Sequence, residues 1–366
     1  MAAKTPGILT DVAKFCVGPS VSIREVIACI DANSRGIALV VDREAVLQGT
    51  ITDGDIRRFM LSYGSLDRGV SELLNLKNDP DYTDPVTASP TASITDLLRI
   101  MRKRRVRQIP ILDKLGRVVG LATQQDLIPD VVLPVQAVVM AGGRGTRLSP
   151  LTDNLPKPML SVGGRPLLEL VVERLQKAGI QTVNVTTHYK AESIKSHFGD
   201  GSDYGVKINY VSEKNPMGTA GGIGLLKSSN ETLLVINGDI LTNVDFGAMV
   251  DYHREQEADI TLAVRKYDVE VPYGVVESDG TYVKRLTEKP SYSFFVNAGI
   301  YLLEPSAREH IGRNEPMDMP DLIQRLLTNN RLVASFPVRE YWLDIGEVAN
   351  YNQAQLDDEQ GIVTTS

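Results

Sequence analysis

The first third of the chain contains an internal repeat that aligns without a gap. The segment 49–56 (GTITDGDI) matches 120–127 (GLATQQDL), and Thr123 lies 71 positions after Thr52 (123 − 52). Each copy reads as an amphipathic helix, a short apolar strand, a second strand that ends at the threonine, and a further helix. Because a unit of this size cannot bury both faces of its sheet alone, we expect the two copies to pack against each other.

The chain is long enough for a second domain. Its 366 residues, of which 42% are hydrophobic, exceed what one core usually holds. We expect residues 1–130 to form one domain, with copies of the repeat at about 15–75 and 85–130. Residues 131–366 are then expected to form the other domain.

Strands and helices alternate in the second domain. The segments expected as strands are 135–140, 184–189, 207–211 and 232–239. Helices are expected at 166–178, which has Pro166 at its start and Gly179 after its end, and at 246–257. This alternation predicts an α/β fold with a doubly wound, mostly parallel sheet of the Rossmann-like kind. Ligands of such sheets bind at the carboxyl ends of the strands.

The composition excludes several classes of function. The formal net charge is −7, so there is no broad basic surface for nucleic acid or an anionic membrane, and any positive site has to be local. The two cysteines, Cys16 and Cys29, cannot form a disulfide framework and suit a reducing compartment. The N-terminal segment lacks the apolar core of a signal peptide, and no run reaches the roughly 18 apolar residues of a membrane span. We therefore expect a soluble cytoplasmic protein that binds neither nucleic acid nor membrane.

A glycine-rich segment follows the first strand of the second domain. Residues 142–148 (GGRGTRL) lack side chains at several positions, which lets backbone amides approach a polyphosphate, and Arg147 adds a forked positive donor. Lys157 stands between Pro156 and Pro158, which stiffen the backbone around it. The spacing matches neither the P-loop nor the dinucleotide fingerprint. A glycine-rich loop alone is weak evidence, and the fixed lysine strengthens its interpretation as a phosphate cradle.

Eight motifs follow one another in the second domain. They are AGGRGTRLSPLT at 141–152, LPKPML at 155–160, GTAGG at 218–222, NGD at 237–239, YG at 273–274, EKP at 288–290, NAGIY at 297–301 and WLDIG at 342–346. In this order they resemble the sugar-phosphate nucleotidyltransferases, the family that includes glucose-1-phosphate thymidylyltransferases and mannose-1-phosphate guanylyltransferases. The resemblance implies transfer of a nucleoside monophosphate from a nucleoside triphosphate to a sugar 1-phosphate, with Mg²⁺ as cofactor.

The resemblance gives roles to five charged residues, and the chemistry supports each role. Asp239 and Asp344 each follow an apolar run and would hold Mg²⁺ between the α-phosphate and the sugar phosphate. Arg147 and Lys157 would neutralise the leaving pyrophosphate and the α-phosphate. Lys289 would hold the phosphate of the sugar substrate. A single aspartate at a strand end is usually a cap or turn residue, so the metal interpretation depends on the pair.

The other motif residues are assigned by the same resemblance to the two substrates. The residues expected to bind the nucleoside triphosphate are Ala141, Gly142, Gly143, Gly145, Thr146, Gly218, Thr219 and Gly222. The residues expected to bind the sugar phosphate are Tyr273, Gly274, Glu288, Lys289 and Asn297. Glu288 would accept hydrogen bonds from sugar hydroxyls, although Glu288 and Lys289 alone would read as an exposed pair at a strand end.

The repeat resembles a cystathionine-β-synthase (CBS) domain pair through its matching Thr-x-x-Asp endings and Ser-Ile openings. In that family the threonine and the aspartate contact the ribose and phosphates of an adenosine-type or related ligand, which implicates Thr52, Asp55, Thr123 and Asp126. A carboxylate at a helix start can accept from ribose hydroxyls while backbone amides face a phosphate. The alternative is that Asp55 and Asp126 cap their helices.

These resemblances predict an enzyme that makes an NDP-sugar and pyrophosphate, with GTP as the favoured nucleotide and a hexose or amino sugar 1-phosphate as acceptor, for surface glycan biosynthesis. A regulatory nucleotide is expected at the CBS pair, and we expect a homo-oligomer. Two alternatives stay open: a UTP- or dTTP-using hexose-1-phosphate transferase, and an inactive regulatory protein that senses nucleotides. The enzyme is favoured because a degenerate domain would be expected to lose its charged residues, and all five are present.

Overall fold

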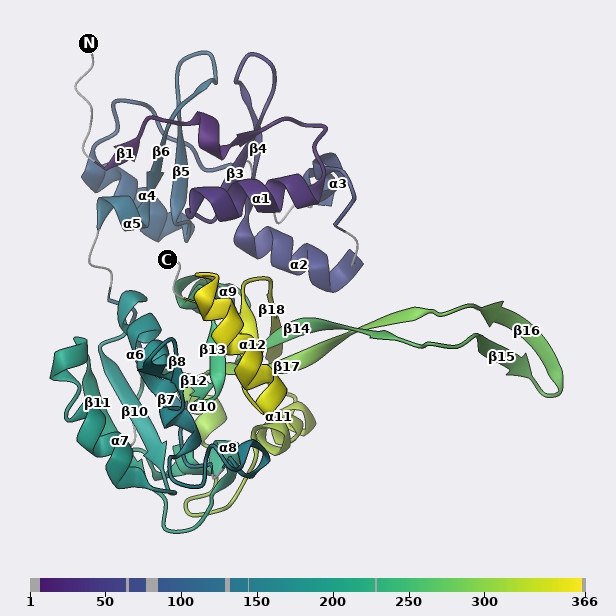
Figure 1. Cartoon of the computed structure of the whole chain (residues 1–366). Coiled ribbons are helices and arrows are strands. Elements are labelled where there is room, and N and C mark those ends of the chain that lie inside the picture. Colours follow the sequence, from purple (N-terminus) through teal and green to yellow (C-terminus); the bar gives the residue numbers. More distant parts are fainter. Residues whose placement is uncertain are drawn as a thin grey trace. The chain divides into compact units, whose positions relative to one another are not determined.

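The computed structural model describes residues 7–63, 66–76, 85–128, 132–143, 145–227 and 229–363. The chain divides into two compact units, Met1–Val131 and Val132–Ser366 (Figure 1). Within the described ranges, no helix is both long enough and apolar enough to cross a lipid bilayer.

The N-terminal unit contains the two copies of the repeat. The first copy consists of α1 (Ile23–Asn33), β3 (Ile37–Val41), β4 (Leu47–Thr52), α2 (Asp53–Tyr63) and α3 (Val70–Leu76). The second consists of α4 (Ile94–Arg104), β5 (Gln108–Leu112), β6 (Val118–Thr123) and α5 (Gln124–Leu127). The segment before them forms β1 (Ile8–Leu9), η1 (Ala13–Phe15) and β2 (Cys16–Val17). The predicted order of helix, strand, strand and helix is confirmed in both copies.

The first helix of each copy begins in the same way. Ser22 caps α1 by accepting a hydrogen bond from the backbone N–H of Glu25. Ser93 caps α4 by accepting one from the backbone N–H of Asp96. Because a serine at this position gives an acceptor to an otherwise unpaired helix N–H, the Ser-Ile opening of each copy fixes where its helix begins.

The two copies share part of their hydrophobic core. Their strands form two three-stranded sheets, in the orders β2-β3-β4 and β1-β6-β5. Phe15, Ile37 and Leu39 from the first sheet region cluster with Val118 and Leu121 from the second. The expectation that the copies pack against each other is confirmed.

A seven-stranded sheet forms the centre of the C-terminal unit. Its strands are β7 (Val135–Met140), β10 (Thr182–Thr187), β11 (Lys207–Ser212), β12 (Thr232–Asn237), β14 (Ile260–Glu270), β17 (Ser291–Leu303) and β18 (Val333–Val338). Their spatial order is β11-β10-β7-β12-β17-β14-β18. All neighbours are parallel except those of β17, which runs antiparallel to β12 and β14. The mostly parallel sheet is confirmed, and its strand order reverses between β7 and β12, where ligands of such sheets bind.

Helices cover both faces of this sheet. On one face, α6 (Leu167–Lys177), α7 (Ala191–Phe198) and α9 (Phe246–Glu255) join one core cluster with the strands. On the other face, a second cluster takes in α8 (Gly218–Gly221), η5 (Gly222–Leu225), α10 (Pro305–Arg308) and α11 (Met319–Thr328). The remaining elements are η2 (Thr146–Leu148), η3 (Lys157–Met159), β8 (Ser161–Val162), β9 (Arg165–Pro166), η4 (Ser202–Tyr204), β13 (Ile240–Thr242), β19 (Trp342–Asp344) and α12 (Val348–Glu359). The sheet is therefore doubly wound, as predicted.

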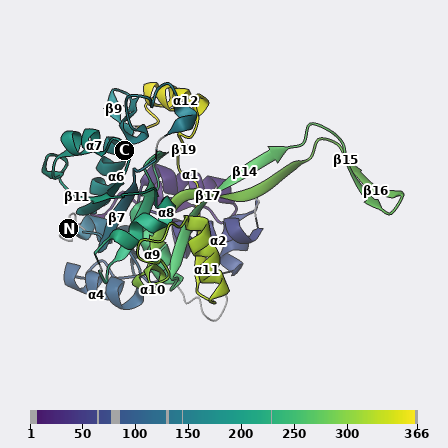
Figure 2. The same cartoon turned by 90° about the horizontal axis from the view of Figure 1, so that it is seen from below.

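Two strands of the sheet continue beyond it as an arm. β14 and β17 stay paired from Val264 opposite Asn297 to Glu270 opposite Ser291, whereas β18 accompanies only the inner part of β14. The arm ends in a hairpin of β15 (Val275–Asp279) and β16 (Tyr282–Thr287). Figures 1 and 2 show the arm projecting from the sheet of this unit. A two-stranded ribbon alone is at best marginally stable in water.

Candidate functional site

Two carboxylates from distant parts of the sequence lie on one small sheet. Asp239 follows β12 and directly precedes β13, and Asp344 is the last residue of β19. β13 and β19 pair antiparallel with Ile240 opposite Asp344, and the N–H of Ile345 donates to the backbone oxygen of Asp239 at 3.0 Å. The short pairing of β13 with β19 therefore places both carboxylates at the carboxyl end of β12.

Three buried side-chain oxygens at this place have no hydrogen-bond partner among the described residues. They are Asn237 Oδ1, Asp239 Oδ1 and Asp344 Oδ1. Burial, and after it the charge of Asp239, raises the pKa of Asp344. Buried oxygens left unpaired are costly, and carboxylate and amide oxygens are the ligands that hard divalent cations prefer. The residues present therefore fit a divalent cation.

Two cationic side chains face the carboxylates. Lys157 Nζ lies 2.5 Å from Asp239 Oδ2, and the two side chains are 14% and 26% exposed. The positive charges of Lys157 and Arg147 both act to lower the pKa of Asp344, against the effect of its burial. Arg147 belongs to η2, which Leu148 anchors in a buried cluster that includes Ile345. The structure thus brings together four of the five charged residues selected from the sequence.

The glycine-rich loop runs from the end of β7 to η2. The N–H of Ala141 donates to the oxygen of Thr186, which continues the sheet for one residue. Gly145 has φ +65°, and a Cβ added there would lie 3.0 Å from the Cβ of Lys157. A Cβ on Gly143 would meet no described atom within 4 Å. The loop is therefore close to Lys157 at Gly145 and open at Gly143, while Arg144 lies outside the described residues.

The remaining predicted positions of this loop are Gly142 and Thr146. A Cβ on Gly142 would lie 3.5 Å from the carboxylate of Glu213. Thr146 begins η2, directly before Arg147. Sequence reasoning did not select Glu213, because it lies in a loop after β11 with no motif around it.

The second glycine motif is held tightly by the protein itself. A Cβ on Gly218, which has φ +75°, would lie 2.5 Å from the oxygen of Met317. A Cβ on Gly222 would lie 2.9 Å from Glu213 Oε1. The N–H of Thr219 donates to Asp318 Oδ1 at 2.9 Å. The backbone of Met317 and the positive φ therefore explain the glycine at 218 independently of the predicted approach of a base and a ribose, whereas at Gly222 the nearest atom is the movable end of the Glu213 side chain.

A cavity of about 360 Å³ opens beside the carboxylates. Its lining residues are Thr219, Asn237, Ile240, Asn297, Ala298, Gly299, Tyr301, Asp318, Pro320, Trp342 and Asp344. Asn297 is fixed there, because its Nδ2 donates to Tyr301 Oη at 2.8 Å and its Oδ1 accepts from the N–H of Gly299. Thr219, Asn297 and Asp344 were selected from the sequence.

Asn237, Trp342 and Asp318 are among the lining residues to which sequence reasoning gave no role. Asn237 and Trp342 stand in the NGD and WLDIG motifs, where only the aspartate was given a role. The indole N–H of Trp342 donates to the oxygen of Ala298 at 2.8 Å. In the sequence, Asp318 is recognisable only as the residue that caps the helix α11. The two motifs could have pointed to Asn237 and Trp342, whereas Asp318 reaches the cavity through tertiary structure alone.

Four residues predicted to bind the sugar phosphate lie on the arm. Tyr273 and Gly274 precede β15, and Glu288 and Lys289 follow β16, so all four lie between the two paired parts of the arm, a region that we name the waist. A Cβ on Gly274 would lie 3.0 Å from Glu288 Oε2, so the two motifs meet there. Tyr273 is 75% exposed. The lining of the cavity includes Asn297 and, within the described part of the chain, none of these four.

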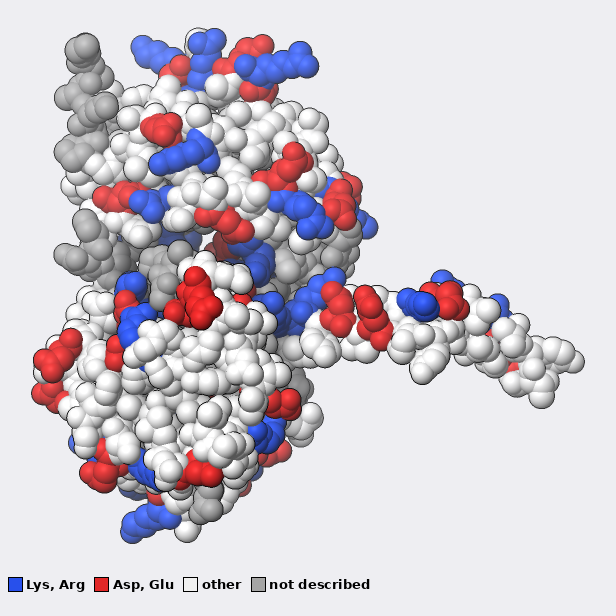
Figure 3. Space-filling model, in the orientation of Figure 1, with Lys and Arg blue, Asp and Glu red and all other residues white. Residues whose placement is uncertain are grey.

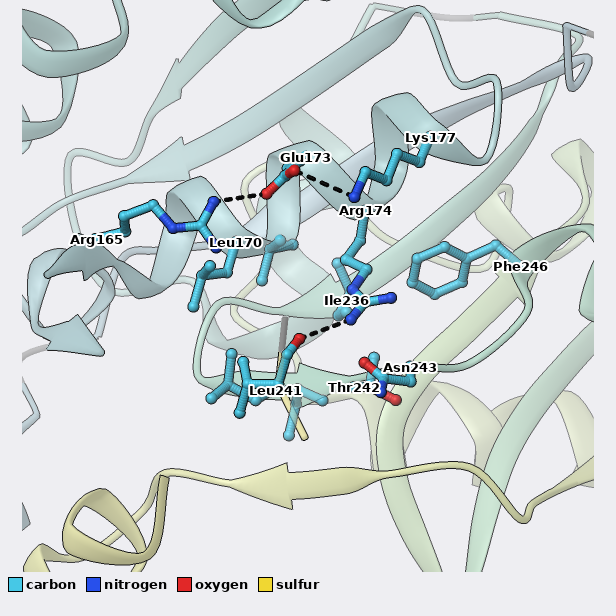
Figure 4. Close-up of a pocket in the computed structure, with 13 residues that line it drawn as sticks. Arg165, Leu170, Glu173, Arg174, Lys177, Ile236, Leu241, Thr242, Asn243 and Phe246 are labelled. Atoms are coloured by element: carbon cyan, nitrogen blue, oxygen red, sulfur yellow. Dashed lines mark hydrogen bonds and ion pairs between the residues drawn. The ribbon is translucent and has the colours of Figure 1, made fainter. Parts of the chain in front are cut away.

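A second, smaller pocket lies beside α6 (Figure 4). Its volume is about 40 Å³, and its polar side chains have hydrogen-bond or ion-pair partners in the protein. Arg165 and Lys177 both contact Glu173, at 2.8 and 3.2 Å, and Arg174 donates to the oxygen of Val363 at 2.7 Å. We interpret it as part of the packing between α6 and the C-terminal segment.

The four residues selected in the CBS pair form equivalent hydrogen bonds in the two copies. Asp55 Oδ2 accepts from the hydroxyl of Thr52 at 2.8 Å, and Asp126 Oδ2 accepts from that of Thr123 at 2.5 Å. In return, each threonine hydroxyl accepts from the N–H of its aspartate. Arg35, from the first copy, also contacts Asp126 through Nε and Nη2, at 3.0 and 2.8 Å. The threonines therefore cap these helices, with Thr123 as the N-cap of α5, whereas the two aspartates lie in the first helical turn and accept from the threonine hydroxyls. Ligand binding stays a prediction.

Both parts of the chain match known protein families. The model of the nucleotidyl transferase family matches residues 136–361, and that of the CBS domain matches 9–62 and 81–131. A mannose-1-phosphate guanylyltransferase of Mycobacterium tuberculosis is 34% identical, with 62% of this chain and 66% of the relative covered. A UTP–glucose-1-phosphate uridylyltransferase of Synechocystis is 31% identical, with 60% and 62% covered. The chain thus spans slightly less than two thirds of the length of these relatives.

A solved structure shares the fold. It is a Bacillus anthracis protein of the glucose-1-phosphate thymidylyltransferase type in complex with sucrose, 24% identical with a TM-score of 0.51. The match covers 61% of this chain and 94% of that one. With the family model covering more than half of the sequence, the chain belongs to the nucleotidyl transferase family, and it carries a pair of CBS domains ahead of that domain.

Proposed function

We propose that this chain transfers a nucleoside monophosphate from a nucleoside triphosphate to a sugar 1-phosphate, with residues 131–366 as the catalytic domain and 1–130 as the CBS pair. In this reaction a phosphate oxygen of the sugar 1-phosphate forms a bond with the α-phosphorus while the bond from that phosphorus to the leaving pyrophosphate breaks. The attacking phosphate is already ionised, so no protein base is required. The products are an NDP-sugar and pyrophosphate.

The observation that carries this proposal is the group of unpaired buried oxygens on Asn237, Asp239 and Asp344 beside two cations. Asp239 and Asp344 would hold Mg²⁺, with Asn237 beside them. When bound, Mg²⁺ would neutralise charge on the α-phosphate and on the sugar phosphate. Two protein carboxylates are enough, because this ion usually takes its other ligands from water and substrate phosphates.

The chain's own cations and amides would bind the triphosphate. Arg147 and Lys157 would neutralise the α-phosphate and the leaving pyrophosphate, where negative charge is concentrated during transfer. The backbone of residues 141–146 would face the phosphates, and the open side of Gly143 leaves room for them. Gly218, Thr219 and Gly222 would stand at the base and ribose. Thr219 supports this assignment most directly, because it lines the cavity.

The sugar phosphate would occupy the cavity beside Asn297, with Lys289 on its phosphate and Glu288 on its hydroxyls. Tyr273 and Gly274 would complete this part of the site. We favour GTP as the nucleotide, because several of the relatives are guanylyltransferases. A UTP-using enzyme is the second candidate, since the uridylyltransferase of Synechocystis is similar to nearly the same degree. An NDP-hexose or NDP-amino sugar is an activated glycosyl donor, which fits surface glycan synthesis.

The test is a screen of the four common nucleoside triphosphates against a panel of hexose and amino sugar 1-phosphates, with release of pyrophosphate as the readout. We expect one pair to stand out, with GTP as its nucleotide and with a requirement for Mg²⁺. Release with UTP or dTTP alone would assign the chain to the second candidate. If no pair releases pyrophosphate, the chain is a binding protein without this activity.

We further propose that a nucleotide binds the CBS pair and adjusts the activity. Thr52 and Asp55 in one copy and Thr123 and Asp126 in the other would contact it. The ion pair between Arg35 and Asp126, at 2.8 Å, joins the two copies of the repeat. A ligand that binds either side chain would therefore also change this contact between the copies. Such a ligand regulates only if its affinity differs between two states of the protein.

A further inference from the structure

The arm carries residues that the proposed sugar site needs, but these residues lie outside the cavity of the same chain. Asn297 lines the cavity, and from there β17 runs outward, paired without interruption, to Ser291. At about 3.4 Å per residue, this stretch covers about 20 Å. Lys289 lies two residues further, at the waist. The paired strands therefore hold Lys289 outside the cavity of its own chain.

One face of the arm is apolar. Tyr267 stands opposite Phe294, and Val269 stands opposite Tyr292, so these four side chains share a face. They are 58%, 55%, 38% and 42% exposed, in that order. Further out, Val276 opposite Leu286 repeats the pattern, at 52% and 65% exposed.

The opposite face of the arm is mainly polar. Asp268 stands opposite Ser293, which donates a hydrogen bond to it, and Glu270 stands opposite Ser291. Phe295, at 42% exposed, is the exception on this face. Figure 3 shows most charged groups of the arm in a row along its inner half, while the rest of its visible surface is largely uncharged. Alternation of apolar and polar residues with a period of two is typical of a ribbon with one face covered and the other in water.

We propose that the arm docks on a second copy of this chain, so that the Lys289 of one chain completes the sugar-phosphate site of the other. A second copy offers the cavity that Lys289 cannot reach in its own chain, and contact with that copy would cover the apolar face of the arm. In a two-fold dimer each arm would reach the other chain in the same way, which buries both arms at once. The charges agree, because Asp318 and Asp344 line the cavity that would receive this lysine.

Docking of the arm on its own body is disfavoured by its backbone. To bring Lys289 to the cavity of its own chain, the ribbon would have to bend sharply, either at the irregular register between Leu262 and Val264 or within the ladder from Val264 to Glu270, with loss of strand hydrogen bonds to β18 or β17. Exchange between two chains leaves that ladder intact. A left-handed backbone at Lys289, with φ +42°, further indicates that this residue is held in a specific arrangement at the waist.

The inference rests on the proposed role of Lys289. The main experiment therefore tests separately whether this lysine is needed for activity and whether it acts on its own chain or on the other chain. Asp239→Asn removes a metal ligand from the body of a chain, and Lys289→Ala removes the phosphate contact from its arm. The two variants are expressed together with different tags, and the mixed dimer is purified on both tags. One of its two sites then has a normal body and a normal arm, so we expect about half of the wild-type activity, while each variant alone is nearly inactive.

The control places both substitutions on one chain. A mixed dimer of the Asp239→Asn/Lys289→Ala chain with a wild-type chain has no complete site if the arm acts on the other chain, and it should be nearly inactive. If the arm acts on its own chain, this control keeps half of the activity and the first dimer has none, and the inference is overturned. Normal activity of the Lys289→Ala variant alone would also overturn the inference, because it would show that the lysine is not needed in the site.

A second measurement does not depend on catalysis. Phe294→Lys puts a charge on the apolar face of β17, and Ser291→Lys puts the same charge on the polar face, opposite Glu270. By sedimentation, we expect the wild type and Ser291→Lys to be dimeric or larger, and Phe294→Lys to shift toward the monomer. A monomeric wild type, or an unchanged Phe294→Lys, would refute arm exchange. This result is informative even if the screen finds no substrate and the proposed function fails.

Discussion

Lys157 Nζ contacts only one oxygen of the Asp239 carboxylate, Oδ2 at 2.5 Å, and leaves Oδ1 buried without a hydrogen-bond partner among the described residues. The lysine therefore neutralises the charge of the carboxylate, while the Oδ1 atom of Asp239 stays available to accept from or bind a ligand. The Oδ1 atom of Asp344 is in the same condition. This arrangement is suited to a ligand that approaches both aspartates from one side.

The first prediction concerns these two carboxylates. Asp239→Asn and Asp344→Asn should each lower turnover by orders of magnitude, because each removes a charged oxygen ligand while keeping the shape of the side chain. Steady-state turnover measures this, and thermal unfolding with and without Mg²⁺ should show that the stabilisation by the ion is lost. Asp245→Asn is the control, since Asp245 caps α9 and asparagine caps equally well. Near wild-type turnover in either site variant would refute the metal assignment.

The second prediction concerns Lys157. If it stabilises charge on the triphosphate during transfer, Lys157→Ala should reduce kcat more than it raises the KM for the sugar 1-phosphate. Lys177→Ala, which removes a lysine from the ion pairs beside α6, should leave both constants unchanged. A change confined to the KM for the sugar 1-phosphate would contradict this role.

The third prediction separates two glycines of one loop. Gly145→Ala introduces a Cβ at φ +65°, 3.0 Å from Lys157, and should lower both the melting temperature and kcat. Gly143→Ala meets no described atom within 4 Å and should keep the melting temperature. If phosphates lie against Gly143, the KM of the Gly143→Ala variant for the nucleoside triphosphate should rise. An unchanged KM in Gly143→Ala would place the phosphates elsewhere.

The fourth prediction concerns stability and pH. His253 is 2% exposed, with Nδ1 2.7 Å from Thr261 Oγ1 and Nε2 3.0 Å from Glu304 Oε1. Burial lowers its pKa below the ordinary 6.5, and Glu304 partly opposes this. The unfolded chain therefore binds the proton first as the pH falls, and the free energy of unfolding decreases below that value.

Melting temperatures measured from about pH 7.5 to pH 5.5 test this. The wild type should lose stability over the range, and His253→Gln should lose less because the titrating group is gone. His310→Gln removes a partly exposed imidazole and should follow the wild type. Equal slopes for His253→Gln and the wild type would show that His253 does not control this dependence.

The fifth prediction concerns the CBS pair. Calorimetry with adenine and guanine nucleotides and with the NDP-sugar product should find a ligand whose binding is weakened in Asp55→Ala and Asp126→Ala. Typical coupling of about 1–3 kcal/mol would change the affinity for substrate by roughly 5- to 150-fold. If neither the binding nor the response of activity differs from the wild type in either variant, the pair has a structural role only.

Local signals in the sequence predicted much of the fold. Ser22 and Ser93 are strong caps, so the helices of the repeat start where expected. The reversed direction of β17 was not predictable, since an apolar run does not specify whether its strand is parallel or antiparallel to its neighbours. The arm was not predicted from the sequence. Alternation of residue types in 266–270 and 291–295 is typical of strands, but it does not indicate that they pair with each other outside a sheet.

The candidate site was predictable where motifs carry charge. Arg147, Lys157, Asp239 and Asp344 could be selected because the motifs that contain them resemble those of a known family, and their residue types match the chemistry of phosphate transfer. Their mutual approach depends on the β13–β19 pairing, which is too short to give a periodic signal. Asp318 was not selected, because an aspartate before a helix is usually only a cap.

The β13–β19 pairing also bears on how such a chain can evolve. Hydrogen bonds between two three-residue strands fix the distance between Asp239 and Asp344, so it does not depend on the segment that joins them. That segment contains the arm and α11, and also α9 and the central strands β14, β17 and β18. Insertions or exchanges in the arm, or in the loop before α11 that carries Asp318, can change the residues beside the cavity while the two carboxylates keep their positions. In the transfer proposed above, the acceptor preference can therefore change by variation of these parts while the two carboxylates are kept.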